Sequence, residues 1–243
     1  MGKLFVVGLG PGSSAGMSGA AHLALKQSKI ICGYTRYVEL IRPLYPGKKY
    51  LATVMRSEIE RCKMAFEAAA EETTAMVCSG DAGVYGMAGL LYELSSGYPA
   101  VEIEIVPGVT AAQSGAAILG APLMQDYAVI SLSDLLIPWE TIEKRLRGAS
   151  LGDFVVVLYN PASRKRTEQM KRACDIFLES RSKETVCGVV RNIGRNGEQS
   201  RILTLGELRH IRVDMLTTVF IGNSQTCLIN GKMVTRRGYE NKR

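Results

Sequence analysis

The sequence has few of the residues that build metal and redox centres. It contains two histidines, His22 and His210, and neither has a second histidine or a cysteine at ligand spacing. Its six cysteines are dispersed singly without a C-x-x-C pair, and four of them stand inside apolar runs. These patterns favour buried free thiols and argue against a metal site built by the protein.

Long apolar runs are also absent. No stretch approaches the roughly 18 uninterrupted apolar residues that a membrane span requires. Glycine and proline interrupt the short apolar run near the start of the sequence, which therefore lacks a cleavable-signal pattern. With 243 residues, of which 47% are hydrophobic and 22% charged, the sequence predicts a globular, cytoplasmic protein without a membrane partner.

The formal net charge of +7 suggests an anionic partner. The charge alone does not distinguish among RNA, a membrane surface and a small polycarboxylate. A solvated basic surface is an equally good interpretation. Aromatic residues make up only 7% of the chain, and no dense basic stretch is interleaved with them. This composition argues against nucleic acid as the partner.

The order of apolar and amphipathic segments predicts an α/β fold. In the first half, β-rich runs alternate with helix-like stretches, which is typical of βα units around a mostly parallel sheet. The expected strands cover residues 3–8, 29–34, 74–80 and 101–108, and the expected helices 20–27, 58–70, 87–94 and 110–119. Because these strands are apolar almost throughout, we expect helices on both faces of the sheet.

The pattern restarts after a Gly-Ala-Pro segment at 120–122. Strands are expected at 127–133, 153–161, 185–192, 201–208 and 217–223, and helices at 139–147 and 167–180. A domain boundary near residues 122–127 then gives two α/β lobes of similar size, 1–122 and 123–243.

A glycine-rich loop with Gly8, Gly10 and Gly12 follows the first expected strand. A dinucleotide-binding loop requires G-x-G-x-x-G and an acidic residue about 20 positions later. Here the third glycine comes one residue early, Pro11 removes an amide donor, and the second strand ends without an acid. The spacing also lacks the Gly-Lys-Ser/Thr of a P-loop. Either a ligand approaches this backbone closely or the glycines only form a tight turn.

Two further flexible loops follow strands, at residues 79–86 and 107–111. In parallel sheets ligands bind outside the carboxyl ends of strands, so the three loops are expected to converge on one pocket. Asp81 carries the only charge of its loop and suits hydrogen bonds from an ammonium or from ribose hydroxyls. Alternatively, Asp81 caps the following helix.

These loops carry a family resemblance. GLGPGS at 8–13, SGDAGVYG at 79–86 and VPGVTAA at 106–112, followed by GAPL at 120–123, resemble the ordered motifs of the tetrapyrrole methylase family. The resemblance implies two α/β domains with S-adenosylmethionine bound in a cleft between them, S-adenosylhomocysteine as a product, and a homodimer.

The second half narrows the resemblance to one branch. Residues 131–140, Tyr159-Asn160-Pro161 with Arg164 and Arg166, and residues 190–192 are similar to the precorrin-3 C17-methyltransferase branch. The broader family often has Gly-Gly-Asp-Pro where this sequence has Ser-Gly-Asp-Ala at 79–82. The resemblance implies methylation at C17 of precorrin-3B or cobalt-factor III, with ring contraction, in cobalamin biosynthesis.

Site residues are carried over from the resemblance. The implied cofactor contacts are Pro11, Gly80, Asp81, Val84, Thr110, Ala111 and Asn160. Ser133, Asp134 and Tyr159 are candidates for a catalytic acid or hydrogen-bond donor, although Asp134 also suits a helix cap and Tyr159 a core position. Arg36, Arg164 and Arg166 are candidates for binding the carboxylates of a corrin precursor, since guanidinium matches carboxylate geometry.

Two other functions remain open at this point. The same fold could methylate RNA or a modified protein side chain, which the basic surface would suit. A non-catalytic nucleotide- or RNA-binding module is the third interpretation. Equilibrium binding of S-adenosylmethionine measured against NAD separates it from the other two.

Overall fold

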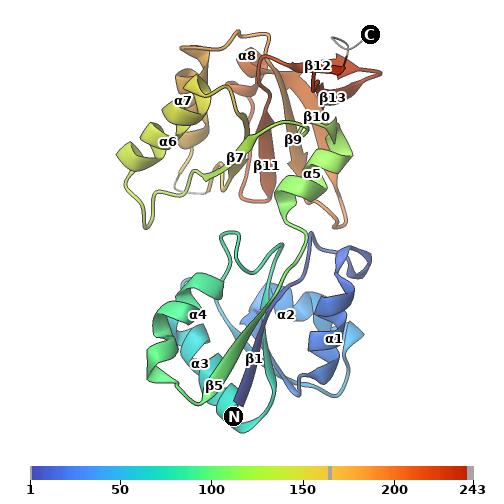
Figure 1. Cartoon of the computed structure of the whole chain (residues 1–243), viewed down its shortest axis with the longest axis vertical. Coiled ribbons are helices and arrows are strands. Elements are labelled where there is room, and N and C mark those ends of the chain that lie inside the picture. The colour runs from blue at the N-terminus through green and yellow to red at the C-terminus, as the bar shows by residue number, and fades with distance from the viewer. Residues whose placement is uncertain (1, 164–165, 240–243) are drawn as a thin grey trace. The chain divides into compact units, whose positions relative to one another are not determined.

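The computed structural model describes residues 2–163 and 166–239 (Figure 1). The chain divides into two compact units, Met1–Ala111 and Ala112–Arg243. This division falls in the first turn of helix α5 (Ala111–Leu119), whereas the sequence suggested a boundary after that helix. The reason is that α5 packs on the second sheet: a Cβ added at Gly115 would lie 2.8 Å from Phe220, and one added at Gly188 would lie 2.5 Å from Leu119.

The first unit is a parallel α/β sandwich. Its strands are β1 (Gly2–Gly8), β2 (Ile30–Tyr34), β3 (Lys49–Thr53), β4 (Thr74–Cys78) and β5 (Val101–Val106). Its helices are α1 (Gly19–Gln27), α2 (Thr35–Ile41), α3 (Glu58–Glu71) and α4 (Ala88–Leu94), with short 3-10 helices η1 (Ser14–Gly16), η2 (Arg42–Leu44) and η3 (Ser95–Gly97).

All pairings in this sheet are parallel, in the order β3-β2-β4-β1-β5. Side chains of β1 alternate between two cores, because successive residues of a strand point to opposite faces. Leu4 and Val6 pack in the core that α3 and α4 cover. Phe5 and Val7 pack in the core that α1 and α2 cover. The parallel sheet with helices on both faces is therefore confirmed, while β3 and α2 were not expected.

The second unit contains a mixed five-stranded sheet and a small three-stranded one. The large sheet is formed by β7 (Tyr127–Ser131), β8 (Val155–Tyr159), β9 (Val186–Arg191), β10 (Gln199–Thr204) and β11 (Thr217–Ile221). The small sheet is formed by β6 (Gly120–Ala121), β12 (Thr226–Ile229) and β13 (Lys232–Thr235). The helices besides α5 are α6 (Trp139–Leu151), α7 (Gln169–Leu178) and α8 (Leu205–Leu208).

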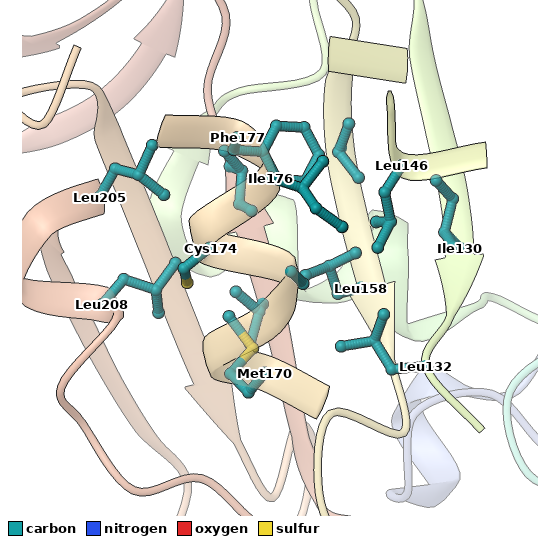
Figure 2. Close-up of a cluster of buried hydrophobic side chains, with 14 of the residues drawn as sticks. Ile130, Leu132, Leu146, Leu158, Met170, Cys174, Ile176, Phe177, Leu205 and Leu208 are labelled. Carbon is teal, nitrogen blue, oxygen red and sulfur yellow. The ribbon is translucent and has the colours of Figure 1, made fainter. Parts of the chain in front are cut away.

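In the large sheet β7 and β8 pair in parallel, whereas β11 pairs antiparallel with both β8 and β9. The strands β7, β8 and β9 therefore run in the same direction. Helices α6, α7 and α8 cover one face of the large sheet, where Leu146, Leu158 and Phe177 belong to a single apolar core (Figure 2). The segment 201–208, expected as one strand, splits into the end of β10 and the short helix α8, since Thr204 and Glu207 form a capping box there.

The structure can be compared with three expectations from the composition, which concern the thiols, membrane-spanning helices and metal sites. All six cysteines are free, and five of them are buried while Cys227 is partly exposed. In residues 2–163 and 166–239, no helix combines the length and the hydropathy that crossing a bilayer needs. The same residues contain no group of three His, Cys, Asp or Glu side chains placed to hold a metal ion.

Candidate functional site

Three loops meet at the carboxyl edge of the first sheet. We call residues 9–18 the first loop, 79–87 the second loop and 107–110 the third loop; they follow β1, β4 and β5. These strands are neighbours in the order β4-β1-β5 and all run in parallel, so their carboxyl ends lie side by side. The three loops therefore lie together, as the sequence predicted.

The first and second loops are joined through their backbones. The Gly10 amide donates to the Gly80 carbonyl at 3.0 Å, and the Gly80 amide donates to the Gly10 carbonyl at 2.8 Å. Both residues have positive φ, 72° and 68°, a region that glycine enters without a steric penalty. The glycines thus allow two loop backbones to pair directly beyond the ends of their strands.

Asp81 joins the second loop to the third. Its Oδ1 accepts the amides of Gly83 at 2.7 Å and Val84 at 3.0 Å, and its Oδ2 accepts the amide of Gly108 at 3.0 Å. The carboxylate therefore closes a turn within its own loop and ties a second loop to it. It does not cap the next helix, because α4 begins at Ala88 after the cap residue Met87.

Ser18 completes the set by joining the third loop to the first. Its hydroxyl donates to the Pro107 carbonyl at 3.3 Å and accepts the Ala21 amide at 3.1 Å as the N-cap of α1. Close packing supports this arrangement, since a Cβ added at Gly108 would lie 2.1 Å from the Gly80 carbonyl oxygen. Each loop is thereby attached to the other two.

The cofactor contacts expected in the first unit all lie at this edge. Val84 exposes 37% of its surface, and Pro11 and Thr110 are partly exposed. A Cβ added at Gly80 would lie 3.7 Å from the Thr110 Cα, so the second and third loops are in contact there as well. Ala111 is the first residue of α5.

Charge distinguishes this edge from a phosphate site. Asp81 is the single formally charged residue in the three loops, and none of them contains Lys, Arg or His. Loops with one negative charge and no cationic side chain suit a ligand that carries a sulfonium and an ammonium group. Burial raises the pKa of the neighbouring Cys78 thiol to about 11, which keeps the end of β4 neutral.

Arg36 lies on the exposed surface of α2, directly after β2. Because β2 pairs with β4 in parallel, the start of α2 belongs to the same carboxyl edge as the second loop. An exposed guanidinium at this position is available to the carboxylates of a ligand.

In the second unit, the carboxyl ends of β7 and β8 form a polar cluster. Asn160 adopts a positive φ of 53°, and its Nδ2 donates to Ser131 Oγ at 2.9 Å. The Ser131 hydroxyl oxygen also accepts the Ser133 amide at 3.2 Å. The expected cofactor contact Asn160 and the expected catalytic Ser133 are therefore linked through Ser131.

Arg166 is the buried centre of this cluster. Its side chain is 9% exposed, and its Nη1 donates to the carbonyls of Leu132 at 2.9 Å and Asn160 at 3.2 Å. Its Nε lies 3.8 Å from Asp134 Oδ1, and Gln169 donates to Asp134 Oδ2 at 3.0 Å. Arg166 thus joins the segments that follow β7 and β8, and its guanidinium faces the protein interior.

The side chain of Tyr159 forms a hydrogen bond with helix α5. The Tyr159 hydroxyl accepts the Ala112 amide at 2.6 Å, which fixes the first turn of α5. Arg164 lies outside the described residues. At the end of β9, Arg191 pairs with Asp214 at 2.8 Å. Partial burial opposes ionisation of Asp214, but hydrogen bonds from Arg191, Thr217 and the Leu216 amide leave its pKa below the usual value.

Sequence reasoning missed three residues that organise the first loop: Ser18, His22 and Tyr45. A serine directly before a helical stretch is a recognisable N-cap signal, so Ser18 was within reach of prediction. His22 was considered only as a metal ligand. Its contacts with residues 8 positions before it and 23 positions after it have no signature in the sequence.

The geometry defines an α/β protein of two units, with three connected loops that form a candidate site at the carboxyl edge of a parallel sheet. A family model described as tetrapyrrole (corrin/porphyrin) methylases matches residues 3–209. The chain belongs to this family, whose members are S-adenosylmethionine-dependent methyltransferases. The resemblance inferred from the loop motifs is confirmed.

Relatives extend the likeness along the whole chain. A probable cobalt-factor III C(17)-methyltransferase of Salmonella typhimurium is 46% identical, covering 97% of this chain and 99% of that protein. The cobalamin biosynthesis protein CbiHC of Archaeoglobus fulgidus is also 46% identical over 99% of this chain, which spans about half of that protein, 54%. A precorrin-3B C(17)-methyltransferase of Sinorhizobium is 38% identical, covering 94% of this chain and 91% of that protein.

Among solved structures, the methyltransferase CobJ is similar in both sequence and fold. It is 36% identical, with a TM-score of 0.90, and the match covers 97% of this chain and 100% of that one.

Proposed function

We propose that this chain is an S-adenosylmethionine-dependent C-methyltransferase that acts at C17 of cobalt-factor III, with ring contraction, in cobalamin biosynthesis. The observation that carries the proposal is the end-to-end match with the Salmonella cobalt-factor III relative, at 46% identity. Two further cobalt-factor III relatives are 42% and 38% identical and the precorrin-3B relative is 38% identical, so the more similar relatives favour the cobalt-containing substrate over the metal-free one.

The three-loop edge is the proposed place of the methyl donor. When bound, S-adenosylmethionine supplies a methyl group carried on a sulfonium. Gly10 and Gly80 keep the loop backbones together, and the carboxylate of Asp81 supplies the negative charge that a cationic ligand favours. Pro11, Gly80, Asp81, Val84, Thr110 and Ala111 are the proposed contacts from this unit, and Asn160 is the proposed contact from the second.

The polar cluster of the second unit is proposed to handle the proton and the carboxylate that ring contraction moves. Ser133 and Asp134 are the candidates for the hydrogen-bond donor or acid, and Tyr159 stays a candidate whose hydroxyl also holds α5. Because Arg166 is buried and donates to two backbone carbonyls, we assign it to positioning these segments. Arg36 and Arg164 remain the proposed partners of the substrate carboxylates.

The proposal is tested by incubating the protein with S-adenosylmethionine and either cobalt-factor III or precorrin-3B under anaerobic conditions. Mass spectrometry should show one added methyl group in the product from cobalt-factor III and S-adenosylhomocysteine in equal amount. A product from precorrin-3B alone would overturn the choice of substrate. No product from either would overturn the C17 activity.

We also propose a cytoplasmic homodimer, as the family resemblance implies. Light scattering coupled to size-exclusion chromatography should give twice the mass of one chain, and a monomer at micromolar concentration would contradict it.

The match with named C17-methyltransferases favours catalysis on a tetrapyrrole over action on RNA, and it favours an enzyme over a binding module. Binding of S-adenosylmethionine measured beside NAD separates the last two directly.

A further inference from the structure

His22 lies between two groups that come from different parts of the first unit. Its Nδ1 is 2.6 Å from the Tyr45 hydroxyl, and its Nε2 is 3.3 Å from the Ser14 carbonyl oxygen. Tyr45 is 6% exposed and follows the 3-10 helix η2, while Ser14 begins η1 in the first loop. The imidazole on α1 therefore connects the first loop to the segment after α2.

The chemistry of the two partners fixes which nitrogen carries the proton. A carbonyl oxygen only accepts hydrogen bonds, so Nε2 must bear the hydrogen that faces Ser14. In the neutral ring Nδ1 is then an acceptor, and the Tyr45 hydroxyl must donate to it. Burial raises the pKa of Tyr45, which keeps this hydroxyl protonated. The hydrogen bonds therefore run in one direction, from Tyr45 through His22 to Ser14.

The turn held by this chain of hydrogen bonds lies directly behind the expected cofactor contact. The Ser14 carbonyl also accepts the Met17 amide at 3.2 Å, which closes η1. A Cβ added at Gly16 would lie 2.9 Å from the ring of Pro11, and one added at Gly10 would lie 2.3 Å from the Gly16 carbonyl oxygen. Displacing η1 would therefore displace the Pro11 segment.

We propose that His22 is a positioning residue for the methyl-donor site, holding the first loop in its ligand-binding form through the Tyr45–His22–Ser14 chain of hydrogen bonds. This inference rests on the proposed function, because it takes the first loop as part of the S-adenosylmethionine site. His22 acts through η1 and Pro11 and does not touch the reacting atoms. Its loss should weaken methyl-donor binding much more than it slows turnover at saturation.

Two substitutions at position 22 separate the hydrogen bond from packing. His22→Leu removes both ring nitrogens at similar volume, whereas His22→Gln keeps an N–H donor close to the Nε2 position. His22→Leu should raise the Kd for S-adenosylmethionine and the KM for it by roughly 3- to 10-fold, the effect of one hydrogen bond, with kcat changed less than about 2-fold. Because His22→Gln keeps the donor to Ser14 but loses the Nδ1 acceptor for Tyr45, its Kd and KM should fall between those of the wild type and those of His22→Leu. His210→Leu, at the exposed second histidine, is the matched control.

Hydrogen exchange of the ligand-free protein gives a readout that does not depend on the proposed function. The amides of Gly16 and Met17, which close η1, should exchange faster in His22→Leu than in the wild type and in His22→Gln. Equal exchange and equal affinity in all variants would overturn the proposal, as would a His22→Gln variant as weak as His22→Leu. A wild type that binds no S-adenosylmethionine, with faster exchange in His22→Leu, would leave the hydrogen-bond chain standing and overturn the proposed function.

Discussion

Replacing Asp81 by Asn removes one carboxylate oxygen from the junction of the second and third loops. The wild-type carboxylate accepts three amides, two on Oδ1 and one on Oδ2. An asparagine oxygen serves the amides of Gly83 and Val84 when it takes the place of Oδ1. Its NH2 group then faces the Gly108 amide, donor against donor. The substitution therefore breaks the tie to the third loop and keeps the turn within the second.

The size of the effect follows from the lost hydrogen bond. A hydrogen bond to a charged group contributes about 1.5–3 kcal/mol, and the partly buried Gly108 amide is left without its acceptor. Since about 1.4 kcal/mol corresponds to a factor of ten, the Gly108 amide should exchange with solvent roughly 10- to 100-fold faster. The amides of Gly83 and Val84 should change much less, because their acceptor is retained.

The assay is amide hydrogen exchange resolved by residue, with Asp126→Asn as a control because Asp126 is exposed and its backbone carbonyl accepts the Val155 amide. Affinity for S-adenosylmethionine measured on the same sample should fall in Asp81→Asn and hold in Asp126→Asn. Wild-type protection of the Gly108 amide in Asp81→Asn would show that the carboxylate does not hold the third loop. Equal acceleration at Gly83, Val84 and Gly108 would mean that the whole edge opens as one unit.

Three further predictions concern the chemistry, the substrate and the thiols. Asp134→Ala should reduce turnover much more than cofactor binding, since the residue lies in the polar cluster of the second unit; steady-state kinetics beside calorimetry checks this, and unchanged turnover removes it from the site. Raising ionic strength should raise the apparent KM for the polycarboxylate substrate by screening exposed arginines such as Arg36, and a flat response contradicts that role. Native alkylation followed by peptide mapping should modify Cys227 first, because burial raises the pKa of the other thiols, to about 12 for Cys32 and Cys174; early labelling of those two would contradict their burial.

The sequence anticipated the meeting of the three loops because that result depends on strand order and direction alone. Apolar runs separated by helices predict a parallel sheet, and its carboxyl edge then collects the loops. The antiparallel course of β11 had no such signal, because an apolar run reads the same in either direction. Helix α2 has seven residues and strand β3 has five, so neither is long enough for periodicity to reveal it.

The role of Gly8 and Gly108 could not be predicted from the sequence either. A glycine in a loop suggests an approaching ligand, but here each approaches a neighbouring loop: a Cβ added at Gly8 would lie 2.6 Å from the Gly108 amide nitrogen. That contact arises from the register of β1 on β5 and not from spacing within either loop. Arg166 was likewise proposed for substrate from its type, whereas its burial and its two carbonyl partners depend on the tertiary fold.

These internal contacts explain why a glycine-rich loop after the first strand does not make a phosphate site. A phosphate cradle presents backbone N–H groups to the anion. Here the amides of Gly10, Gly80, Gly83, Val84 and Gly108 all donate to acceptors within the protein, and three of them donate to the carboxylate of Asp81. An anion against these three loops would find those five amides already occupied and would meet the negative charge of Asp81, so selection against phosphate follows from the same hydrogen bonds that hold the loops together. A sulfonium compound without phosphate meets neither obstacle, and this electrostatic contrast is the physical basis for expecting S-adenosylmethionine to bind here in preference to NAD.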